Sequence, residues 1–524
     1  MFLLSCKQIT QMSKNYYITT PIYYPSARPH MGHAYSSIIA DFFARFKRID
    51  GFKVYFLTGT DEHGLKIQRS AEKDNIDPQK FCDKISKTFQ DLSEKLNLTN
   101  TDFIRTTEDR HKKSVQHLWN ELEKSGDIYL SKYSGWYSVS DEAYYNNDEI
   151  EEVDGIKIAI SSKSKVEWIE EESFFFKLSK WEKPLLDYYE KNSDFILPES
   201  RKNEVISFVK NGLKDLSVSR KSFSWGIKVP NNKEHIIYVW LDALTNYISA
   251  LNYPNLEDDL YKNFWPASIH LIGKDILRFH AIYWPAFLLA AKLPLPKKVY
   301  GHGWILSDNE KMSKSKGNIL DPLEIIDTYG LDPLRYYLIK EVSFGNDGNI
   351  SQERLENCIN SDLANNYGNL CQRVTAFAKK NCEGIIPDGI EFNNEDYKIL
   401  KKFEDNLEII RKKIDNQDIN FYIEFIVSSL FETNKYFNDQ EPWKKKDNPI
   451  RLNTIVYTTL EIVRKISYLL FPIIPSSSLK ALEIFGLNEN DIDLSSIADH
   501  QFLKPKTKIN NVGILFNKIE KNND

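Results

Sequence analysis

Two short motifs, far apart in the sequence, constrain the fold of this chain most. The first, Pro29-His30-Met31-Gly32-His33, follows the apolar run Tyr16–Thr19 and precedes Ala34–Ile49, which is apolar on one helical face. A strand, a turn and a helix start in this order present backbone N–H groups and the positive end of a helix dipole, which favour a phosphate group. The pattern predicts an α/β fold with a phosphate site at this turn.

The second motif is the lysine loop, Lys311-Met312-Ser313-Lys314-Ser315. Its two lysines, Lys311 and Lys314, supply positive charge where negative charge develops during attack on an α-phosphate. In the first motif, Gly32 lets a nucleotide lie against the backbone, and the imidazoles of His30 and His33 donate hydrogen bonds. Each motif alone also suits a solvated loop or a capped helix start. Together they predict an ATP site that adenylates a carboxylate.

Composition narrows the class of protein. A chain of 524 residues suggests two or three domains, and its 41% hydrophobic content supports real cores. No apolar run approaches the ~20 residues of a membrane span. The net charge of -5 argues against a general nucleic-acid coat, so any RNA contact must be local. The five scattered cysteines form no Cys-x-x-Cys pair, which fits reduced thiols in a cytoplasmic protein without zinc.

The pattern along the chain changes near residue 345. Before it, strand-like runs alternate with helical spacing, interrupted after about residue 125 by an aromatic and acidic stretch that reads as a β-rich insertion. After it, helical patterns dominate. We expect strands of the main sheet at 53–59, 236–243, 269–273 and 298–302, helices at 360–380, 397–415, 421–437 and 452–470, and a closing strand at 511–516.

Two acidic residues follow expected strands at their carboxyl ends, where an open parallel sheet binds ligands. Asp61 follows the run Lys53–Gly59 and is placed to meet a substrate cation. Asp275 follows the run Ile269–Gly273 at a strand end as well. For both, a helix cap is the competing interpretation.

From Tyr16 to Glu520 the chain resembles the class I aminoacyl-tRNA synthetases, and within them the methionyl-tRNA synthetases. The resemblance implies a Rossmann-type parallel sheet with an inserted connective module, followed by an α-helical anticodon-binding bundle. The bounds we expect are 1–14 for an N-terminal extension, 15–125 and 221–310 for the two halves of the catalytic domain, 126–220 for the insertion, 311–350 for the lysine loop and linking region, 351–510 for the helical domain and 511–524 for a tail. The first residues suit either a short transit segment or an upstream extension with a start at Met12, and we expect a cytoplasmic protein.

The resemblance also implies which residues bind the substrates. ATP is expected at His30, Gly32, His33, Gly273, Asp275, Lys311, Ser313 and Lys314, of which His30, His33, Lys311 and Lys314 are expected to be catalytic. Methionine is expected at Ile22, Tyr24, Asp61, Trp240, Ala243, Tyr247, Ile276, His280 and Trp284. Aromatic faces suit a polarizable thioether, at roughly 0.3–1.5 kcal/mol per sulfur–aromatic contact. Without the motifs, Trp240 and Trp284 would read as ordinary core residues.

For tRNA, the resemblance points to Asn369, Arg373 and Trp443. Asn369 and Arg373 are four residues apart and share a helical face. Their side chains can hydrogen-bond splayed bases, and a tryptophan ring offers a stacking surface worth about 1–3 kcal/mol per base. Asn369 alone would be an ordinary surface residue.

Zinc and the oligomeric state are predicted from absences. Relatives often carry zinc knuckles in the insertion, where this chain has Trp136-Tyr137-Ser138-Val139-Ser140-Asp141-Glu142. Serine and aspartate do not make a plausible four-ligand zinc shell, so we expect no structural zinc. No β-barrel tRNA-binding extension follows the helices, which favours a monomer.

We therefore predict an ATP- and Mg²⁺-dependent enzyme of the cytoplasm, without a membrane partner, that joins L-methionine to elongator and initiator tRNA(Met) through methionyl-adenylate. The alternatives are an inactive, synthetase-like RNA-binding protein and a class I synthetase for another amino acid. A leucyl, isoleucyl or valyl enzyme would need a longer insertion, and a cysteinyl enzyme a cysteine-rich zinc site.

Overall fold

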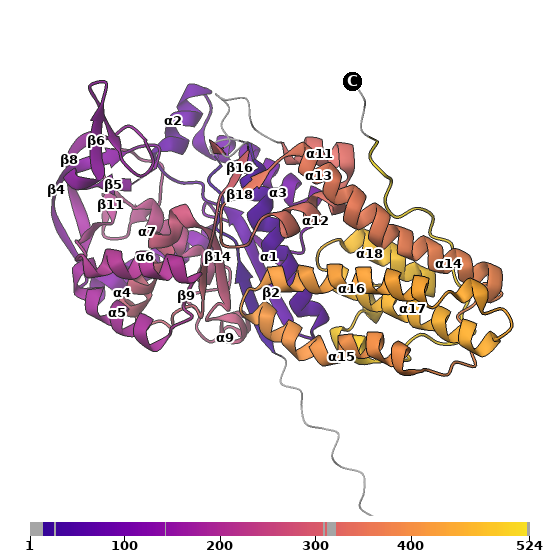
Figure 1. Ribbon diagram of the computed structural model, residues 1–524. Helices are drawn as coiled ribbons and strands as arrows, with labels where there is room; N and C mark the ends of the chain where they lie inside the picture. The colour runs from indigo at the N-terminus through magenta and orange to yellow at the C-terminus, as the bar shows by residue number, and fades with distance from the viewer. Residues whose placement is uncertain (1–13, 26–27, 142, 308–309, 312–320, 521–524) are drawn as a thin grey trace, which may run out of the picture. The chain divides into compact units, whose positions relative to one another are not determined.

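The computed structural model describes residues 14–25, 28–141, 143–307, 310–311 and 321–520 (Figure 1). The chain divides into two compact units. We name them the sheet unit, Asn15–Ala40 with Val54–His302, and the bundle unit, Met1–Lys14 with Asp41–Lys53 and Gly303–Asp524. The division falls within helix α1 (Met31–Ile49), so this one helix contributes residues to both. The predicted Ser313 and Lys314 lie outside the described residues.

The sheet unit is built on a six-stranded sheet. In spatial order its strands are β3 (Asp102–Arg105), β2 (Lys53–Thr60), β1 (Asn15–Thr19), β14 (Ile269–Gly273), β15 (Val299–His302) and β9 (Ile196–Leu197). β2 with β3, β1 with β14, β14 with β15, and β15 with β9 pair in parallel. The strand order reverses between β1 and β14, and an open parallel sheet binds its ligands at such a reversal, beyond the carboxyl ends of the strands.

In the sequence, helices connect the strands of this sheet. They are α2 (Leu65–Lys73), α3 (Pro78–Lys95), α4 (Asp109–Lys124), α5 (Glu182–Lys191), α6 (Glu199–Lys210), α7 (Val239–Leu244), α8 (Asn246–Ser249), α9 (Asp259–Phe264) and α10 (Trp284–Ala290). Local sequence sets their starts: Asp77 caps α3 by accepting hydrogen bonds from the N–H groups of Gln79 and Lys80. The last six residues of β2 are buried, as expected for a strand covered on both faces.

The β-rich segment expected after residue 125 is present. β4 (Ile128–Ser138) pairs along its length with antiparallel β8 (Glu167–Phe176), and a four-stranded sheet results with β5 (Ala143–Tyr145) and β10 (Leu216–Ser217). β6 (Ile150–Val153) and β7 (Ile156–Ala159) form a separate hairpin. β9 also lies in the range 126–220, yet it joins the main sheet.

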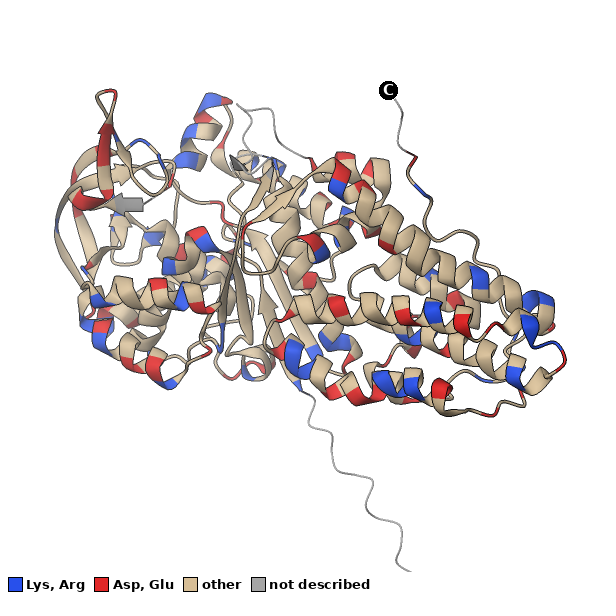
Figure 2. Ribbon diagram, viewed as in Figure 1, with Lys and Arg blue, Asp and Glu red and all other residues tan. Residues whose placement is uncertain are grey.

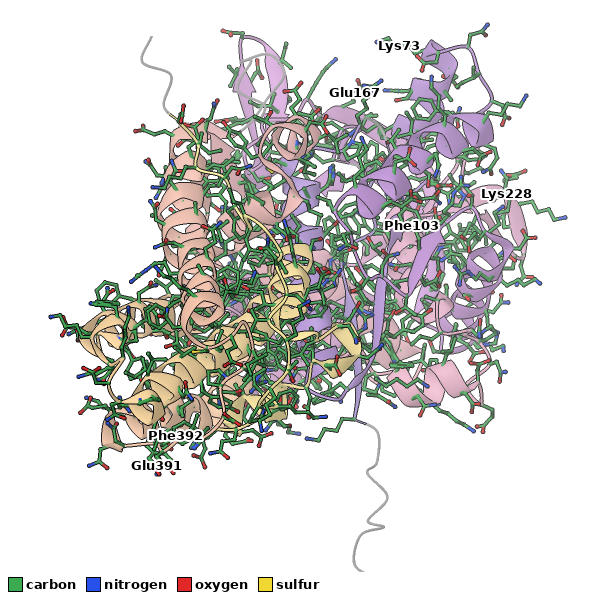
Figure 3. The ribbon with its side chains drawn as sticks, turned by 90° about the vertical axis from the view of Figure 1, so that its right-hand side faces the viewer. Lys73, Phe103, Glu167, Lys228, Glu391 and Phe392 are labelled. Carbon is green, nitrogen blue, oxygen red and sulfur yellow. The ribbon has the colours of Figure 1, made fainter. Side chains whose placement is uncertain are left out.

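The exposed side chains of Lys73 and Lys228 extend away from the ribbon of the sheet unit (Figure 3).

One expected strand of the main sheet is wrong. The run Ile236–Ala243 does not continue the parallel sheet: β13 (Asn232–Ile237) belongs to a small antiparallel sheet with β11 (Ser219–Arg220) and β12 (Lys228–Val229). The chain then turns at Tyr238 and enters α7. A short buried apolar run has the same appearance in a strand and in a buried helix, so composition did not separate the two.

The bundle unit is mainly helical. Its helices are α11 (Pro322–Tyr329), α12 (Leu331–Glu341), α13 (Gln352–Cys358), the π-helix η6 (Ile359–Gly368), α14 (Asn369–Asn381), α15 (Asn394–Asp415), α16 (Ile419–Asp439), α17 (Pro449–Leu470) and α18 (Pro475–Leu482). Every residue of α17 from Thr454 to Leu470 is buried, so α17 is the central helix. Acidic and basic residues alternate along α15, which keeps a solvent face (Figure 2). Phe392, labelled in Figure 3, packs against Tyr397 and Tyr457.

A buried ion-pair group ties α1 to the bundle helices. Oδ2 of Asp41 lies 2.7 Å from Nε of Arg45 and 2.7 Å from Nη2 of Arg335 on α12. Arg335 also donates to the carbonyl oxygen of Ile473 at 2.8 Å. Because the three charged side chains are buried, removing Asp41 would leave two guanidinium groups without their shared carboxylate, which costs about 3–5 kcal/mol.

Two short features complete the bundle unit. β16 (Ile305–Ser307) pairs with β17 (Glu310–Lys311) and with β18 (Gly348–Ile350). The closing strand expected at Asn511–Phe516 is wrong, since those residues form no strand. The carbonyl oxygen of Ile514 instead accepts a hydrogen bond from Nζ of Lys480 at 3.1 Å, so the segment lies along α18 without a strand partner.

Candidate active site

The turn between β1 and α1 stands where the strand order of the main sheet reverses. Helix α1 begins at Met31 and has no acidic residue in its first turn. The N–H groups of His33 and Ala34 donate to the carbonyl oxygen of His30 at 3.0 and 3.2 Å, which closes the first turn. The helix start expected from the first motif is therefore formed, with the polarity that favours a phosphate.

Hydrogen bonds fix which nitrogen of His30 and His33 carries the proton. The N–H of Gly32 donates to Nδ1 of His30, and the N–H of His30 donates to Nδ1 of His33, both at 3.1 Å. A ring nitrogen that accepts holds no proton, so each neutral ring is protonated on Nε2. Burial lowers the pKa of His33 well below its ordinary value, and a proton on the neighbouring His30 would lower it further.

The two rings lie 3.8 Å apart, and His33 also rests against the edges of Tyr23 and Phe89. A pair of Nε2–H donors held side by side suits two oxygens of one phosphate.

Two glycines allow close approach on either side of the reversal point. A Cβ on Gly32 would lie 3.0 Å from Cε1 of His30, and a Cβ on Gly273 would lie 2.6 Å from Oδ1 of Asp275. A side chain at Gly273 would therefore displace the carboxylate of Asp275. Asp275 itself is exposed, in the short helix η3 (Lys274–Ile276) that follows β14.

Four of the residues predicted to bind methionine meet in the sheet unit: Tyr247, Ile276, His280 and Trp284. The hydroxyl of Tyr247 lies 2.7 Å from Nε2 of His280, and Nδ1 of His280 lies 3.0 Å from the carbonyl oxygen of Ile276. A carbonyl only accepts, so His280 is protonated on Nδ1, and the Tyr247 hydroxyl donates to Nε2. Burial lowers the pKa of His280 to about 4, so the ring is neutral. Trp284 is fully buried, with its ring centre 6.2 Å from that of Tyr247.

Two aromatic residues that the sequence did not indicate complete this group. His270 stacks on Tyr247 with ring centres 4.0 Å apart, and Phe279 stacks on Trp240 at 3.6 Å. We name the whole set the aromatic cluster: Trp240, Tyr247, His270, Phe279, His280 and Trp284. His270 was detectable as a polar residue within the apolar run Ile269–Gly273. Phe279 resembled any other apolar residue.

Burial and a second imidazole explain the charge state of the cluster. Burial lowers the pKa of His270 well below its ordinary value, and a proton on His280 would lower it further. Among the described residues, Nε2 of His270 and Nε1 of Trp284 have no hydrogen-bond partner. The cluster is therefore neutral and mostly aromatic, with very few polar atoms directed into it.

The remaining predicted pocket residues border the same core. Ile22, Tyr24, Trp240 and Ile276 are partly buried and pack against the cluster of buried residues that contains Tyr247 and Trp284. Ala243, on α7, is buried.

Asp61 follows β2 directly, and its side chain is largely buried. Its N–H donates to the carbonyl oxygen of Tyr23 at 2.9 Å, while the hydroxyl of neighbouring Tyr24 donates to the carbonyl oxygen of His63 at 3.0 Å. The loop after β1 and the loop after β2 are thus joined by hydrogen bonds.

The lysine loop is described only at its start. Lys311 ends the short strand β17, which pairs with β16 through Leu306 opposite Lys311. Ser313 and Lys314 lie outside the described residues.

The predicted anticodon residues all belong to the bundle unit. Asn369, the first residue of α14, is exposed, and Arg373 lies one turn later. Nη2 of Arg373 donates to Oδ1 of Asn438 at 2.6 Å, and its guanidinium lies over the ring of Phe437. Trp443, in the 3₁₀ turn η7 (Pro442–Lys444), is 42% exposed and rests edge-on against the same Phe437 ring. Phe437 therefore links Arg373 to an exposed tryptophan face.

The segment around Asp141, where we expect no zinc, is held together by hydroxyl groups. Oδ2 of Asp141 accepts hydrogen bonds from Tyr145, Ser162 and Ser164, and the hydroxyl of Ser138 donates to that of Ser164 at 3.0 Å. Burial raises the pKa of Asp141, but these hydrogen bonds outweigh it and leave the pKa below its ordinary value. Within the described residues, no three His, Cys, Asp or Glu side chains are grouped to hold a metal ion.

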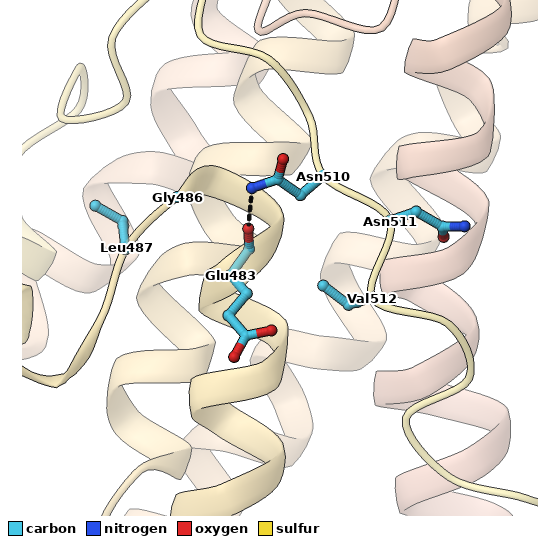
Figure 4. Close-up of a pocket in the computed structure, with 6 residues that line it drawn as sticks. All are labelled: Glu483, Gly486, Leu487, Asn510, Asn511 and Val512. Carbon is cyan, nitrogen blue, oxygen red and sulfur yellow. Dashed lines mark hydrogen bonds between the residues drawn. The ribbon is translucent and has the colours of Figure 1, made fainter.

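The predicted site residues do not line the surface pocket shown in Figure 4. That pocket lies in the bundle unit and is lined by Glu483, Gly486, Leu487, Asn510, Asn511 and Val512. One hydrogen bond, from Nδ2 of Asn510 to the carbonyl oxygen of Glu483 at 2.8 Å, crosses its wall. Across the part of the chain that the structure describes, no helix is both long and apolar enough to pass through a membrane.

Two family descriptions match the sequence. "tRNA synthetases class I (M)" matches residues 16–157 and 156–375. "Anticodon binding domain of methionyl tRNA ligase" matches residues 386–524.

Individual proteins match over nearly the whole chain. A methionine--tRNA ligase of Rickettsia felis is 49% identical over 517 residues, 97% of this chain and 99% of its own length. One of Brucella suis is 50% identical over 476 residues, 90% of this chain and 92% of its own. The structure of Mycobacterium tuberculosis methionyl-tRNA synthetase in complex with methionyl-adenylate is similar with a TM-score of 0.94 and 43% identity, covering 96% of this chain and 99% of that one.

Proposed function

The chain belongs to the class I methionyl-tRNA synthetases, and on this premise we propose that it joins methionine to tRNA(Met) through methionyl-adenylate. The single observation that carries the choice of substrate is the neutral aromatic cluster beside the reversal point of the sheet. A charged or strongly polar side chain would lose its hydration there without recovering equivalent hydrogen bonds. A thioether is polarizable, forms only weak hydrogen bonds, and gains contacts with aromatic faces.

The pocket recognises the methionine side chain by shape and by neutral groups. The tautomer of His280 is fixed by the carbonyl oxygen of Ile276, so the Tyr247 hydroxyl gives its proton to His280 rather than to a ligand. The indole N–H of Trp284 is the buried donor that remains for a weak bond to sulfur. Trp240, Ala243 and Ile276 form further walls of the pocket in this proposal.

The backbone of the amino acid is bound at the strand ends. The Asp61 carboxylate pairs with the substrate ammonium, while Ile22 and Tyr24 flank it. An ammonium paired in this way leaves the substrate carboxylate directed away from Asp61, toward the turn that carries His30 and His33. Positioning of this kind supplies much of the acceleration of a two-substrate step.

Activation of methionine consumes ATP. The carboxylate oxygen attacks the α-phosphorus, the bond to the bridging oxygen of pyrophosphate breaks, and methionyl-adenylate and pyrophosphate form. His30 and His33 donate from Nε2 to phosphate oxygens, Gly32 and Gly273 admit the nucleotide, and Asp275 accepts from the ribose. Lys311, Ser313 and Lys314 stabilise the charge that develops, with Lys314 having the largest effect on rate. Mg²⁺ accompanies the phosphates.

In the second step, a ribose hydroxyl of the 3′-terminal adenosine of tRNA attacks the carbonyl carbon of methionyl-adenylate, an ester forms, and AMP leaves with the electrons of the broken bond. An exposed Trp443 face, with Arg373 held nearby through Phe437 and Asn369 on the same helix as Arg373, supports a base-stacking and hydrogen-bonding site for the anticodon. Both the elongator and the initiator tRNA(Met) are substrates in this proposal, because they share the methionine anticodon.

Several further properties complete the proposal. The protein works without structural zinc, since the hydroxyl groups around Asp141 satisfy each other where a knuckle would stand. It acts as a monomer in the cytoplasm. Its domains follow the bounds 15–125 and 221–310 for the catalytic domain, 126–220 for the insertion, 311–350 for the linking region and 351–510 for the anticodon domain, between an extension at 1–14 and a tail at 511–524.

Charging of tRNA tests the whole reaction. Purified protein with ATP, Mg²⁺ and methionine should esterify initiator and elongator tRNA(Met) transcripts, and replacement of the anticodon should abolish charging of both. Charging that does not depend on the anticodon would show that the bundle unit does not recognise the anticodon. Binding of tRNA(Met) without charging, in folded protein, would favour an inactive RNA-binding protein instead.

A further inference from the structure

A buried carboxylate is held between two histidines behind the aromatic cluster. Oδ2 of Asp242 lies 2.6 Å from Nδ1 of His63, and Oδ1 of Asp242 lies 2.7 Å from Nε2 of His111. Asp242 and His111 are fully buried, and His63 is 4% exposed. None of these three side chains was predicted to bind a substrate, and the reaction described above uses none of them.

The carboxylate of Asp242 is ionised. Burial by itself raises the pKa of Asp242, but the charge of His63 and hydrogen bonds from both histidines outweigh it, so that the pKa lies below its ordinary value. On the far side of His111, the Ser249 hydroxyl donates to the carbonyl oxygen of Thr245 at 2.9 Å and lies 3.1 Å from Nδ1 of His111. The two nitrogens of His111 therefore both face oxygen atoms, and the ring holds Asp242 on the side opposite His63.

The pair His63–Asp242 joins two walls of the proposed methionine pocket. Asp242 lies on α7, between Trp240 and Ala243. His63 lies two residues after Asp61 in the loop that follows β2, and its carbonyl oxygen accepts the hydrogen bond from Tyr24. A single 2.6 Å hydrogen bond to a charged group thus connects the wall that holds the amino acid backbone to the wall that holds its side chain.

The hydrogen bond also restricts the orientation of the His63 ring. With Nδ1 fixed on Asp242, the ring stands edge-on to Trp225 at 5.6 Å, and the indole N–H of Trp225 donates to the carbonyl oxygen of Glu62 at 2.6 Å. The loop Asp61–His63 is therefore held from two sides, by Asp242 and by Trp225. A buried, charge-assisted bond of this kind is short and directional, so it fixes distances between the elements it joins.

From this arrangement we infer that His63 and Asp242 are positioning residues for methionine: they set the separation between Asp61 and the Trp240–Ala243 wall. The inference rests on the proposed function, because it concerns the same pocket. It predicts a specific defect. Breaking the pair should weaken the binding of methionine, whereas ATP, bound at the turn before α1 and beyond β14, should bind as before.

The test compares His63→Leu with His63→Asn in methionine-dependent ATP–pyrophosphate exchange. Leucine removes the hydrogen bond, whereas an asparagine amide N–H can reach Asp242 as Nδ1 did. His63→Leu should raise the KM for methionine about ten-fold or more, the effect of losing one hydrogen bond to a charged group. The KM for ATP should change by less than about two-fold. In His63→Asn, the KM for methionine should return most of the way from the His63→Leu value to that of the unaltered chain. His117→Gln, a partly exposed histidine on α4, serves as the matched control and should change neither constant.

Other results would overturn the inference. An unchanged methionine KM in folded His63→Leu would do so, as would an equal rise in both KM values. If His63→Leu does not fold, Asp242→Asn decides, because it keeps the shape and removes the charge. In Asp242→Asn, the same selective rise in the KM for methionine is expected. If this variant does not fold either, the His63–Asp242 pair serves stability and the inference is overturned. A failure of the proposed function would appear differently, as no methionine-dependent exchange in the unaltered chain.

Discussion

The hydroxyl of Tyr247 donates a 2.7 Å hydrogen bond to Nε2 of His280, whose other nitrogen is held by the carbonyl oxygen of Ile276. Both residues are buried, so this bond is not exchanged for a bond to water. It commits the proton of the Tyr247 hydroxyl and the lone pair on Nε2 of His280 to each other. In the function we propose, a pocket lined by this cluster selects an uncharged, polarizable side chain.

Removing the hydroxyl should therefore damage methionine binding. In Tyr247→Phe, Nε2 of His280 becomes a buried acceptor without a partner, at a cost of about 1–3 kcal/mol. We expect a rise in the KM for methionine of about ten-fold in pyrophosphate exchange, with the KM for ATP unchanged. Tyr188→Phe, in the same unit but outside the cluster, is the control. Equal methionine KM values in the two variants would refute the role of the bond.

Burial of neutral histidines should make stability depend on pH. The pKa of His280 falls from 6.5 in the unfolded chain to about 4 in the folded one, so between these values the unfolded state binds more protons. The free energy of unfolding should therefore fall as the pH is lowered from about 6.5 toward 4, with a contribution from His280 of about 3 kcal/mol at pH 4. Above pH 6.5 this contribution should not vary.

Urea unfolding at several pH values measures this effect. His33 and His270, whose pKa values are also lowered by burial, act in the same direction. The difference between the unaltered chain and His280→Gln isolates His280, and it should shrink steadily between pH 6.5 and 4. A difference independent of pH would mean that His280 is not neutral and buried in solution.

Trp443 should affect tRNA and not methionine activation. Trp443→Ala removes one stacking surface, worth about 1–3 kcal/mol per base. The KM for tRNA(Met) in aminoacylation should rise about ten-fold, while methionine-dependent pyrophosphate exchange without tRNA stays unchanged. Trp168→Ala, which removes another half-exposed tryptophan from β8, should change neither. If Trp443→Ala and Trp168→Ala lose charging to a similar extent, the effect is not specific to Trp443, and its role in binding the anticodon is refuted.

The hydroxyl group network around Asp141 should replace zinc. Asp141→Ala leaves the hydroxyls of Tyr145, Ser162 and Ser164 without their common acceptor, so the free energy of unfolding should fall by about 1–3 kcal/mol. Elemental analysis should find much less than one zinc per chain, and a chelator should leave the Tm unchanged. A tightly held zinc, or a Tm that drops on chelation, would contradict the proposal.

Elements with a strong local signal could be predicted from the sequence. β2, β14 and β15 follow continuous apolar runs, and α15 to α17 follow long helical patterns. The helix start after His30 was predicted because its turn chemistry is local. Ile236–Ala243 was misassigned because a short apolar run does not distinguish a strand from a buried helix. The strand expected at Asn511–Phe516 failed for a related reason, since pairing depends on a partner far away in the sequence.

The site was predictable only where motifs mark it. His270 and Phe279 were missed because their stacking on Tyr247 and Trp240 is a tertiary contact between separate elements. The Asp242 bridge was missed for the same reason: His63, His111 and Asp242 are distant in sequence and meet only in the folded core.

Methionine-dependent ATP–pyrophosphate exchange tests the central claim most directly. The purified chain, with Mg²⁺ and ATP, is offered each of the twenty amino acids in turn. The aromatic cluster predicts exchange with methionine and at most weak exchange with any other. Exchange that is faster with another amino acid, or no exchange with methionine in folded protein, would contradict the account.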